Sequence, residues 1–484
     1  MPDSTEVVRT PLGRDEPGLF AAVREAVRGA RPNYDYTEGS IGRAILLLAV
    51  PMVLEMLMES IFVVWDIYMV GHVRRGATEA VAAVGLTESM MNIVYTLAMG
   101  LSIGATATVA RRVGEQDAEG AAHTAAQVVL LGVGLSLALG VCGALFAPSL
   151  LALMGAERAV VASGSNFTRV MLGANASVVM LFIVNAVFRG AGDAAQAMRV
   201  LWLANLINIA LGPCLIFGLG PFPELGVTGA AVATSIGRGT GAIYAFSKLW
   251  GAGGRVRLAP RHFRPDPELM TRLVRLSGAA TFQVFVTTAS WVALTLIIAR
   301  FGSVAVAGNI IGMRVIMFAL LPSFGMANAA ATLVGQSLGA GKPERAEKAV
   351  WRACFYNMLF LACVGLIFFV FADAIVGLFA DAGAGPEVHA YARDCLRIIS
   401  TGFLFYAYGM VLTQSFNGAG DTRTPTRINV FVFWLWEIPL AYVLAYQMGM
   451  GARGVFVAVT VAFSTLALVS AFFFRRGRWK TKRV

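Results

Sequence analysis

Three carboxylates lie within an otherwise apolar run, LEMLMESIFVVWDIYMV at residues 54–70: Glu55, Glu59 and Asp66. An acidic side chain at the centre of a bilayer helix costs at least about 2.5 kcal/mol, so such residues are rare and usually functional. A helix turns by 100° per residue, which places Glu59 about 40° from Glu55 and Asp66 about 20° from Glu59. We interpret this shared stripe as the wall of a water-filled cavity that couples transport to a cation. The alternatives are an internal ion pair with a basic residue such as Arg314, or an acidic side chain that reaches outward near the end of the helix.

Other polar residues inside apolar runs are candidates for the same coupling and substrate cavity. Asn205 and Asn208 are three residues apart and share a helix face. The remaining candidates are Asn175, Asn185, Glu88 and Glu437. For the asparagines the alternative is a hydrogen bond between helices, worth about 0.6 kcal/mol in a membrane.

The composition indicates the elements that must position these residues. Apolar residues make up 57% of the 484 residues and charged residues 14%, and the mean hydropathy is +0.70. Soluble domains are about 45–50% apolar and about 25% charged. The sequence therefore predicts an all-α polytopic membrane protein whose main partner is the lipid bilayer.

Twelve apolar windows are long enough to cross a membrane, which takes about 20 residues. They begin near Ala44, Val81, Ala121, Phe167, Met198, Val227, Leu273, Val304, Ala349, Arg393, Ile428 and Val455. We expect a polar cytoplasmic segment at 1–40, an N-lobe of six helices at 41–250, a cytoplasmic linker at 251–271, a C-lobe of six helices at 272–474 and a basic cytoplasmic tail at 475–484. Within residues 1–40 we favour disorder over a short amphipathic helix at LFAAVREAVRG.

Basic residues predict the orientation, because positively charged connectors stay in the cytoplasm. Twelve spans place both termini on the same side of the membrane. The segments on that side contain 28 Lys and Arg, whereas the loops on the other side contain five. We therefore expect a multi-pass protein of the inner (plasma) membrane with both termini cytoplasmic. The net charge of +11 follows from this topology, and we expect no nucleic-acid partner.

An internal repeat divides the chain into two halves. FRGAGD at 188–193 recurs as FNGAGD at 416–421, and ATVARRVGEQDAEGA at 107–121 aligns with TLVGQSLGAGKPERA at 332–346, matching Gly114 to Gly339. Because each unit has six spans, an even number, both units begin on the same side of the membrane. They are therefore parallel repeats related by a pseudo-two-fold axis. Two such lobes form the architecture of alternating-access transporters.

Short motifs give little support to an enzyme. GAGDAA at 190–195 formally fits a dinucleotide fingerprint but lies between two bilayer-length runs, with no strand before it. GAGK at 339–342 lacks the remainder of a phosphate-binding loop, so we do not expect ATP as the energy source. The sequence contains no defensible nucleophile set and no metal-ligand spacing. We expect no enzyme activity, no metal and no cofactor beyond a coupling ion, H⁺ or Na⁺.

Several stretches together resemble the multidrug and toxic compound extrusion (MATE) transporters. They are LAVPMV, VVWDIYMVGH, AMGLSIGATATVAR, FRGAGD, ATLVGQSLGAGKPERA and FNGAGDTRTPTR. The resemblance runs from about residue 40 to 474. It implies two six-helix lobes that form a V and an antiport of organic, often cationic and aromatic, compounds against protons or sodium. We expect the protein to be a monomer.

The resemblance assigns roles to individual N-lobe residues. Asp66 matches the aspartate that bacterial members use for coupling, so a sodium ion near Asp66 is the alternative to a proton. Asn208 matches the asparagine of the family pattern N-x-x-x-D-P, but Gly212 stands where its aspartate should be. Glu55 or Glu59 would then replace the missing acid.

In the second lobe the resemblance is weaker. Members of the sodium-using type carry acids in spans seven and ten, where this sequence has Gln283 and Tyr406. Both differences argue against a sodium site in the C-lobe. Glu437, in WEIPLAY, would be an additional protonatable group there.

The function that the sequence favours is a secondary efflux antiporter for small organic compounds, coupled to protons rather than sodium. One alternative is a flippase for lipid-linked precursors, which would want a strongly basic cavity. The other is a membrane enzyme or scaffold that transports nothing.

Overall fold

The structure, a computed structural model, describes residues 19–29, 34–71, 78–251, 254–379 and 385–482, and within these the secondary structure is helical with no strand. The helix α1, Leu19–Arg28, precedes the first lobe. The N-lobe comprises α2 (Ile41–Gly71), α3 (Thr78–Gly114), α4 (Ala118–Leu153), α5 (Arg158–Gly173), α6 (Asn175–Ala191), α7 (Ala194–Phe217) and α8 (Val227–Trp250). A short 3₁₀ turn, η1 (Pro260–Phe263), lies in the linker.

The C-lobe repeats the same order of long helices. It comprises α9 (Pro267–Ala299), α10 (Ser303–Gly339), α11 (Pro343–Val370), α12 (Ala372–Phe379), α13 (Pro386–Ser400), α14 (Phe403–Gly418), α15 (Arg423–Asn429), η2 (Val430–Glu437), α16 (Ile438–Tyr442), η3 (Val443–Gln447) and α17 (Ala452–Arg475), and η4 (Arg478–Thr481) follows. The segments from α15 to η3 form one continuous span in which η2 and η3 have π-helical hydrogen bonding.

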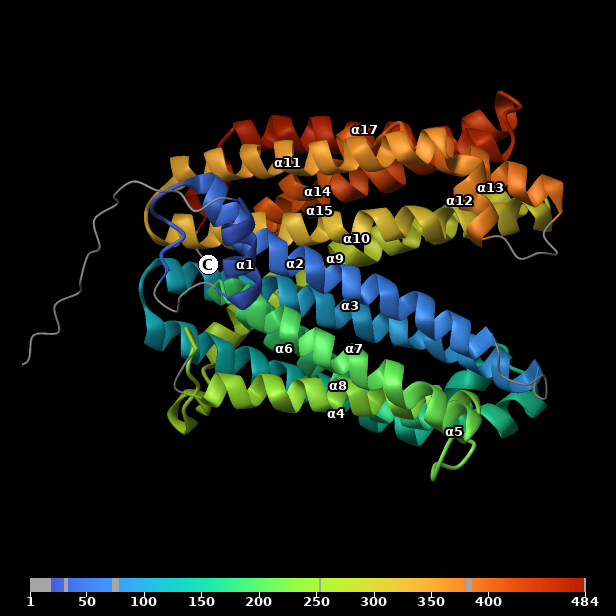
Figure 1. The fold of residues 1–484 in the computed structure, drawn as a ribbon, viewed down its shortest axis with the longest axis horizontal. Coiled ribbons are helices and arrows are strands. Elements are labelled where there is room, and N and C mark those ends of the chain that lie inside the picture. The colour runs from blue at the N-terminus through green and yellow to red at the C-terminus, as the bar shows by residue number, and fades with distance from the viewer. Residues whose placement is uncertain (1–18, 30–33, 72–77, 252–253, 380–384, 483–484) are drawn as a thin grey trace, which may run out of the picture.

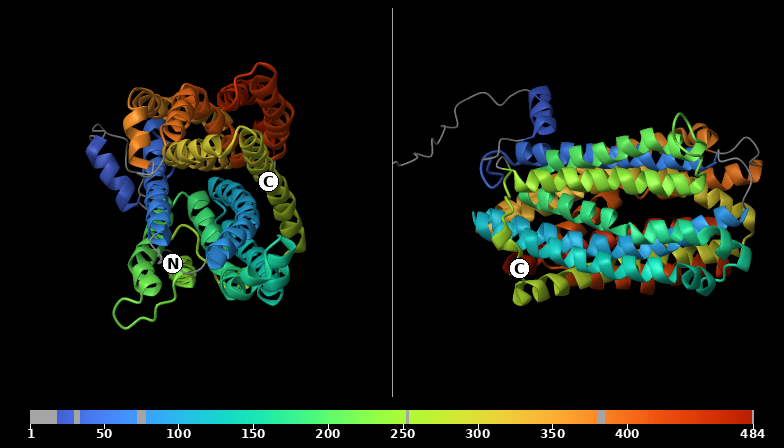
Figure 2. Two further views of the ribbon diagram at one scale, coloured as in Figure 1. Left: turned by 90° about the vertical axis from the view of Figure 1, so that its right-hand side faces the viewer. Right: turned by 90° about the horizontal axis from the view of Figure 1, so that it is seen from below.

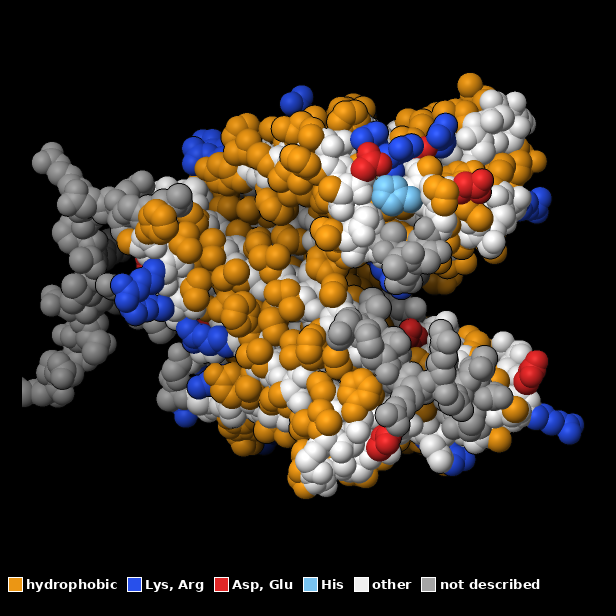
Figure 3. Space-filling model, turned by 45° about the vertical axis from the view of Figure 1, so that its right-hand side comes forward, with side chains coloured by type: hydrophobic (Ala, Val, Ile, Leu, Met, Phe, Trp, Pro, Cys, Tyr) orange, Lys and Arg blue, Asp and Glu red, His pale blue; other side chains and the backbone are white. Residues whose placement is uncertain are grey.

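Ten of the described helical spans are long and apolar enough to cross a membrane, and an eleventh is the pair α13 and α14, bent by 62° at the break between them. The sixth expected span forms the full-length helix α8, but α8 carries Arg238 and Lys248 and is not among these spans by composition. A band of hydrophobic side chains covers the middle of the molecule (Figure 3). These observations confirm an all-α polytopic membrane fold, although the count of twelve is not reached by composition alone.

The duplicated GAGD motif ends a span in both lobes. Gly192 and Gly420 both have a φ of +80°, a left-handed conformation that favours glycine. The corresponding span of each lobe also consists of two consecutive helices, α5 and α6 in the N-lobe and α13 and α14 in the C-lobe, and the second pair is the strongly bent one. The repeat predicted from the sequence therefore corresponds to a repeated helix arrangement.

The two lobes lie side by side and are joined mainly through α2 and α3 of one and α9 and α10 of the other (Figures 1 and 2). The helix α1 and the C-terminus lie at one end of the bundle, here called the termini end. At the opposite end, the open end, the surface is hollowed by a cleft between the lobes (Figure 3). The molecule is thus closed at one end and open at the other.

Glycines allow the lobes to touch backbone to backbone at the termini end. A Cβ atom at Gly114 of α3 would overlap the backbone of Gln336 in α10, and one at Gly339 of α10 would overlap the backbone of Arg111 in α3. We call this contact the glycine seam. The two glycines are the pair that the repeat aligned, so the seam lies on the pseudo-two-fold axis. Small residues at a helix crossing let backbones approach closely in a membrane.

Residues 34–39, here called the strap, add polar bonds between the lobes at the same end. The hydroxyl of Tyr36 donates to the carbonyl of Gly192 in the N-lobe at 3.0 Å. The Arg345 guanidinium of the C-lobe donates to the carbonyls of Tyr36 at 3.0 Å and Glu38 at 2.8 Å. Burial raises the pKa of Tyr36 to about 12, so this phenol remains a donor at physiological pH.

The N-terminal segment differs from its expected disorder. Residues 19–28 form α1, whose Glu25 pairs with Arg43 of α2 at 2.8 Å. Phe20 is 92% exposed on this helix. The amphipathic alternative is therefore correct for 19–28, whereas residues 1–18 lie outside the described part of the chain. The domain boundaries predicted from the sequence stay predictions.

The glycine seam predicts that a single methyl group will destabilise the fold. Gly339→Ala should lower the free energy of unfolding by about 1–3 kcal/mol, because the added Cβ meets backbone that cannot move aside cheaply. Gly134→Ala in α4 is the matched control, since a Cβ there meets no atom within 4 Å. Thermal unfolding in detergent measures both. Equal midpoints for the two variants would contradict the seam.

Candidate functional site

Glu55 lies in the interior of the N-lobe and not on an open cavity. It is 1% exposed, and its Oε1 pairs with the guanidinium of Arg189 in α6 at 2.9 Å. The amide of Asn185, one helical turn earlier, donates to the same oxygen at 3.5 Å. In the structure Glu55 forms the kind of internal ion pair that the alternative described. Its partner is Arg189 and not Arg314.

Glu59, one turn further along α2, is part of a second polar group. Its Oε2 accepts a hydrogen bond from the amide of Asn205 in α7 at 3.0 Å, and its Oε1 lies 3.9 Å from the guanidinium of Arg238 in α8. Arg238 also donates to the hydroxyl of Tyr95 in α3 at 2.8 Å. Two carboxylates and two guanidiniums, from Glu55, Glu59, Arg189 and Arg238, thus form a neutral N-lobe network.

The other predicted N-lobe residues surround this network. Asn208 donates to the hydroxyl of Thr234 in α8 at 2.8 Å. The Cβ position of Gly212 meets only the amide oxygen of Asn208, at 3.8 Å, so there is room where the family aspartate is missing. Glu88 is exposed on α3. The side chain of Asp66 lies outside the described residues, although its helix α2 is described.

Glu437 occupies a different environment in the C-lobe. It is 1% exposed, and its Oε2 accepts a hydrogen bond from the hydroxyl of Ser290 in α9 at 2.6 Å. No basic group among the described side chains forms an ion pair with it. Glu437 ends the π-helical segment η2, and π-helical turns are frequent at functional sites.

Gln283 and Tyr406 are both buried, and no hydrogen bond to another described side chain joins them to Glu437. The Oε1 of Gln283 and the hydroxyl of Tyr406 are buried without a hydrogen-bond partner among the described residues. The ring of Tyr406 stacks on Phe463 with centroids 3.9 Å apart. The predicted residues therefore divide between an N-lobe network and the C-lobe interior, where Tyr406 and Glu437 are close enough to interact electrostatically.

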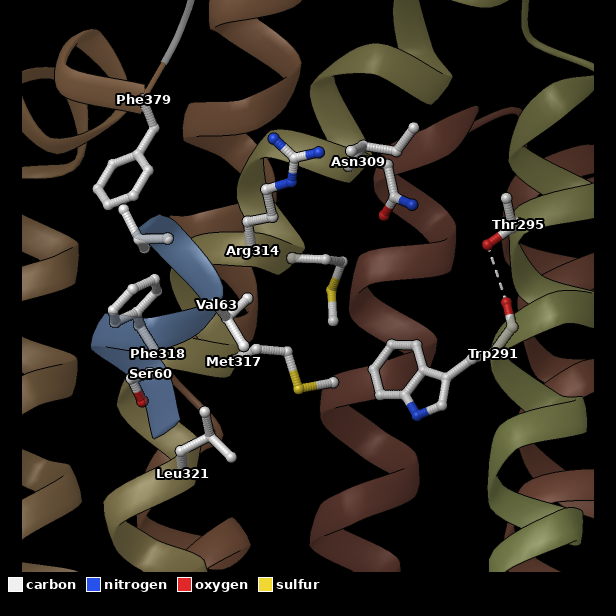
Figure 4. Close-up of a pocket in the computed structure, with 13 residues that line it drawn as sticks. Ser60, Val63, Trp291, Thr295, Asn309, Arg314, Met317, Phe318, Leu321 and Phe379 are labelled. Carbon is white, nitrogen blue, oxygen red and sulfur yellow. Dashed lines mark hydrogen bonds between the residues drawn. The ribbon is translucent and has the colours of Figure 1, made fainter. Parts of the chain in front are cut away.

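A cavity of about 520 Å³ lies between α2 of the N-lobe and the C-lobe helices α9, α10 and α12 (Figure 4). Arg314 and Asn309 are at one end of the cavity, and Trp291 and Met317 extend into it from the other. Its volume is typical of a small-molecule site, which usually measures about 300–1,000 Å³. We call it the C-lobe cavity. It is lined by Ser60, Val63, Val64, Trp291, Thr295, Asn309, Ile310, Met313, Arg314, Met317, Phe318, Leu321 and Phe379.

The functional candidates that the sequence analysis missed are mostly basic or hydroxyl partners. Arg189 lies inside the FRGAGD motif and Arg238 inside GRGTGA, and neither motif by itself indicates a partner for an acid. An acid within a membrane span usually needs a basic partner, and this rule could have drawn attention to both arginines. No sequence signal distinguishes Ser290 from other span hydroxyls.

The family model MatE matches the chain twice, over residues 51–214 and 279–443. Among curated proteins, a probable multidrug resistance protein NorM of Thermotoga maritima is 27% identical over 447 residues, covering 92% of this chain and 94% of that protein. A probable multidrug resistance protein NorM of Pseudomonas aeruginosa is 28% identical and covers 91% of this chain and 90% of its own length.

A solved structure also matches the fold. It is described as the outward-facing conformation of a multidrug resistance MATE family transporter of the MOP superfamily. The TM-score is 0.85 at 25% identity, and the match covers 91% of this chain and 96% of that one. The similarity therefore extends over nearly the whole length of both chains.

The N-lobe network predicts a strong penalty for removing one partner of the buried ion pair. Arg189→Met should reduce the free energy of unfolding by about 3–5 kcal/mol, because it leaves Glu55 buried without its partner. The double variant Arg189→Met/Glu55→Gln should recover part of this loss. Denaturation in detergent micelles with a double-mutant cycle gives the coupling.

The exposed pair Arg272–Glu268 of α9 is the matched control. Its single variants should change stability by less than about 1 kcal/mol. The effects of the two single variants of the exposed pair on the free energy of unfolding should be additive. Additive effects at Arg189 and Glu55 as well would exclude an interaction between these two residues.

Proposed function

The chain belongs to the MatE family, and from this premise we propose that it is a secondary active efflux antiporter that exports small organic compounds in exchange for protons. Sodium is the alternative coupling ion. We place it as a monomer in the inner membrane with both termini in the cytoplasm. The transported compound and the ion would use one alternating cleft and no bound cofactor.

The observation that best supports transport is the cleft between the two lobes at the open end (Figure 3), together with the C-lobe cavity beside it. The cavity is lined by both lobes, because Ser60, Val63 and Val64 come from α2 and the other residues from the C-lobe. A site built from two bodies changes shape when one rocks against the other. Binding in it would therefore favour one conformation over the other.

The closed end provides the matching gate. The glycine seam and the strap hold the lobes together at the termini end. Opening toward that side requires the contacts of Arg345 and Lys342 with the strap to break, including the 3.2 Å pair between Lys342 and Glu38. These are water-accessible polar contacts of modest individual energy, which suits a gate that must open repeatedly.

For the coupling ion, Glu437 is the C-lobe candidate and Asp66 the N-lobe candidate. Glu437 is buried against Ser290 with no basic partner among the described residues. Adding or removing one proton at Glu437 changes the charge of the C-lobe interior. The packing of the surrounding helices can change in response. Glu55 and Glu59 are already balanced by arginines, so we assign them to the structure of the N-lobe and not to coupling.

The substrates expected from the sequence are aromatic, often cationic compounds. The cavity lining supports the aromatic part of this expectation, because Trp291, Phe318 and Phe379 offer stacking surfaces and Met313 and Met317 adaptable apolar contact. A cationic group would need an ionised acid at the cleft. Asp66 is the residue that we propose for it.

Transport assays on proteoliposomes test the proposed function. Vesicles loaded with the cationic dye rhodamine 123 should release it when the external solution is made acidic, and a sodium gradient at equal pH should give no release. Glu437→Gln and Asp66→Asn should each abolish release driven by pH. The matched control is Glu387→Gln, which neutralises an exposed carboxylate at the start of α13.

Three outcomes would contradict this proposal. Release that follows only the sodium gradient would replace the proton as coupling ion. Wild-type release by both Glu437→Gln and Asp66→Asn would exclude these carboxyls. Lipid scrambling without dye release, measured on the same vesicles, would favour the flippase alternative.

A further inference from the structure

Arg314 is a charged residue at an unusual depth. It lies on α10 eleven residues after the helix begins at Ser303, or about 16 Å along a helix that rises 1.5 Å per residue. A charge inside a bilayer helix is costly and usually marks a substrate or ion pathway. Its side chain is exposed and lines the C-lobe cavity. No carboxylate among the described side chains forms an ion pair with it.

Three carboxylates of the described spans have surroundings of a different kind. Glu55 and Glu59 of α2 contact Arg189 and Arg238 inside the N-lobe. Glu437 is buried against Ser290. Among the described residues that line the C-lobe cavity, the charged side chain is the cation Arg314.

The rest of the cavity has the shape and chemistry of a site for an amphiphilic molecule. Arg314 and the amide of Asn309 lie at one end, and Trp291 and Met317 at the other (Figure 4). Asn309 is 9% exposed, and none of the hydrogen bonds within the described part of the chain uses its amide. An aromatic body would pack against Trp291 while an acidic group reached the guanidinium and the amide.

We propose that the C-lobe cavity binds aromatic organic anions, with Arg314 as the residue that recognises the anionic group. This inference rests on the proposed transport function and adds aromatic anions to the often cationic aromatic compounds considered there. A guanidinium binds a carboxylate through two parallel hydrogen bonds, and such charge-assisted bonds are about twice as strong as neutral ones.

The position of the cavity connects this recognition to the transport cycle. Val63 and Val64 of α2 line the same cavity as Arg314, and they belong to the other lobe. Closing the open end would move these valines relative to the C-lobe and change the volume around the bound anion. The anion would therefore favour the conformation in which the cavity is widest.

Two dyes with the same xanthene ring system but opposite charge test the proposal. Fluorescein is anionic and rhodamine 123 is cationic. Binding to the full-length protein in detergent is measured by fluorescence polarisation. We expect Arg314→Gln to weaken fluorescein binding by roughly tenfold or more and to leave rhodamine 123 binding unchanged or tighter. Arg314→Lys, which keeps the charge but loses the two-bond geometry, should lie between.

Arg300→Gln is the matched control, because it removes the same charge from an exposed position at the end of α9, outside the cavity lining. It should leave both affinities at the wild-type value. Equal weakening of both dyes in Arg314→Gln would make Arg314 a structural residue and overturn the proposal. Unchanged fluorescein affinity in that variant would overturn it as well.

The variant Asp66→Asn tests whether Arg314 is instead an internal partner of Asp66. Fluorescein binding that is absent in the wild type and appears only in Asp66→Asn would overturn the proposal. The transport assay separates this inference from the proposed function. Fluorescein binding that depends on Arg314, without release driven by either gradient, would leave the anion site standing and remove the antiport.

Discussion

The backbone contact between α3 and α10 at the termini end is the constraint on which the rest of the structure depends. Gly114 and Gly339 let two helices from different lobes touch without side chains between them. The lobes cannot separate at this end while that contact and the strap persist. Because α3 and α10 are long and rigid, closure at one end leaves the other end free to diverge, and the cleft is the consequence (Figure 3).

The two lobes share an order of helices but not a distribution of charge. The N-lobe interior balances Glu55 and Glu59 with two arginines, a costly arrangement that stays stable only while every partner remains in place. The C-lobe holds Glu437 with a hydroxyl partner and presents Arg314 to the cavity. A repeated scaffold thus carries a structural network on one side and the groups suited to ion and substrate binding on the other.

The spatial order of these groups has a functional meaning. The seam lies at the termini end, the N-lobe network lies within the helices that meet α2, and the C-lobe cavity lies toward the cleft. α2 carries Glu55 and Glu59 of the network and Val63 of the cavity, and it packs on α10 of the other lobe. Movement of this one helix would therefore change the cavity and the inter-lobe contact together, while the ion pairs keep it attached to the N-lobe.

The sequence by itself determined the membrane fold, the repeat and the importance of the residue 54–70 run. These conclusions follow from properties local to the chain, because apolar length predicts spans and a constant offset between motifs predicts symmetry. The repeat in the sequence also aligned Gly114 with Gly339, but it did not show that the two glycines lie at one backbone contact. Only the tertiary structure decided which side chain meets which. Glu55 and Asp66 share a helical stripe, yet Glu55 is buried against Arg189, 134 residues away, and Arg314 lines a cavity with residues from four helices. A stripe defines a direction around one helix, but the neighbours in that direction depend on the packing of all the others.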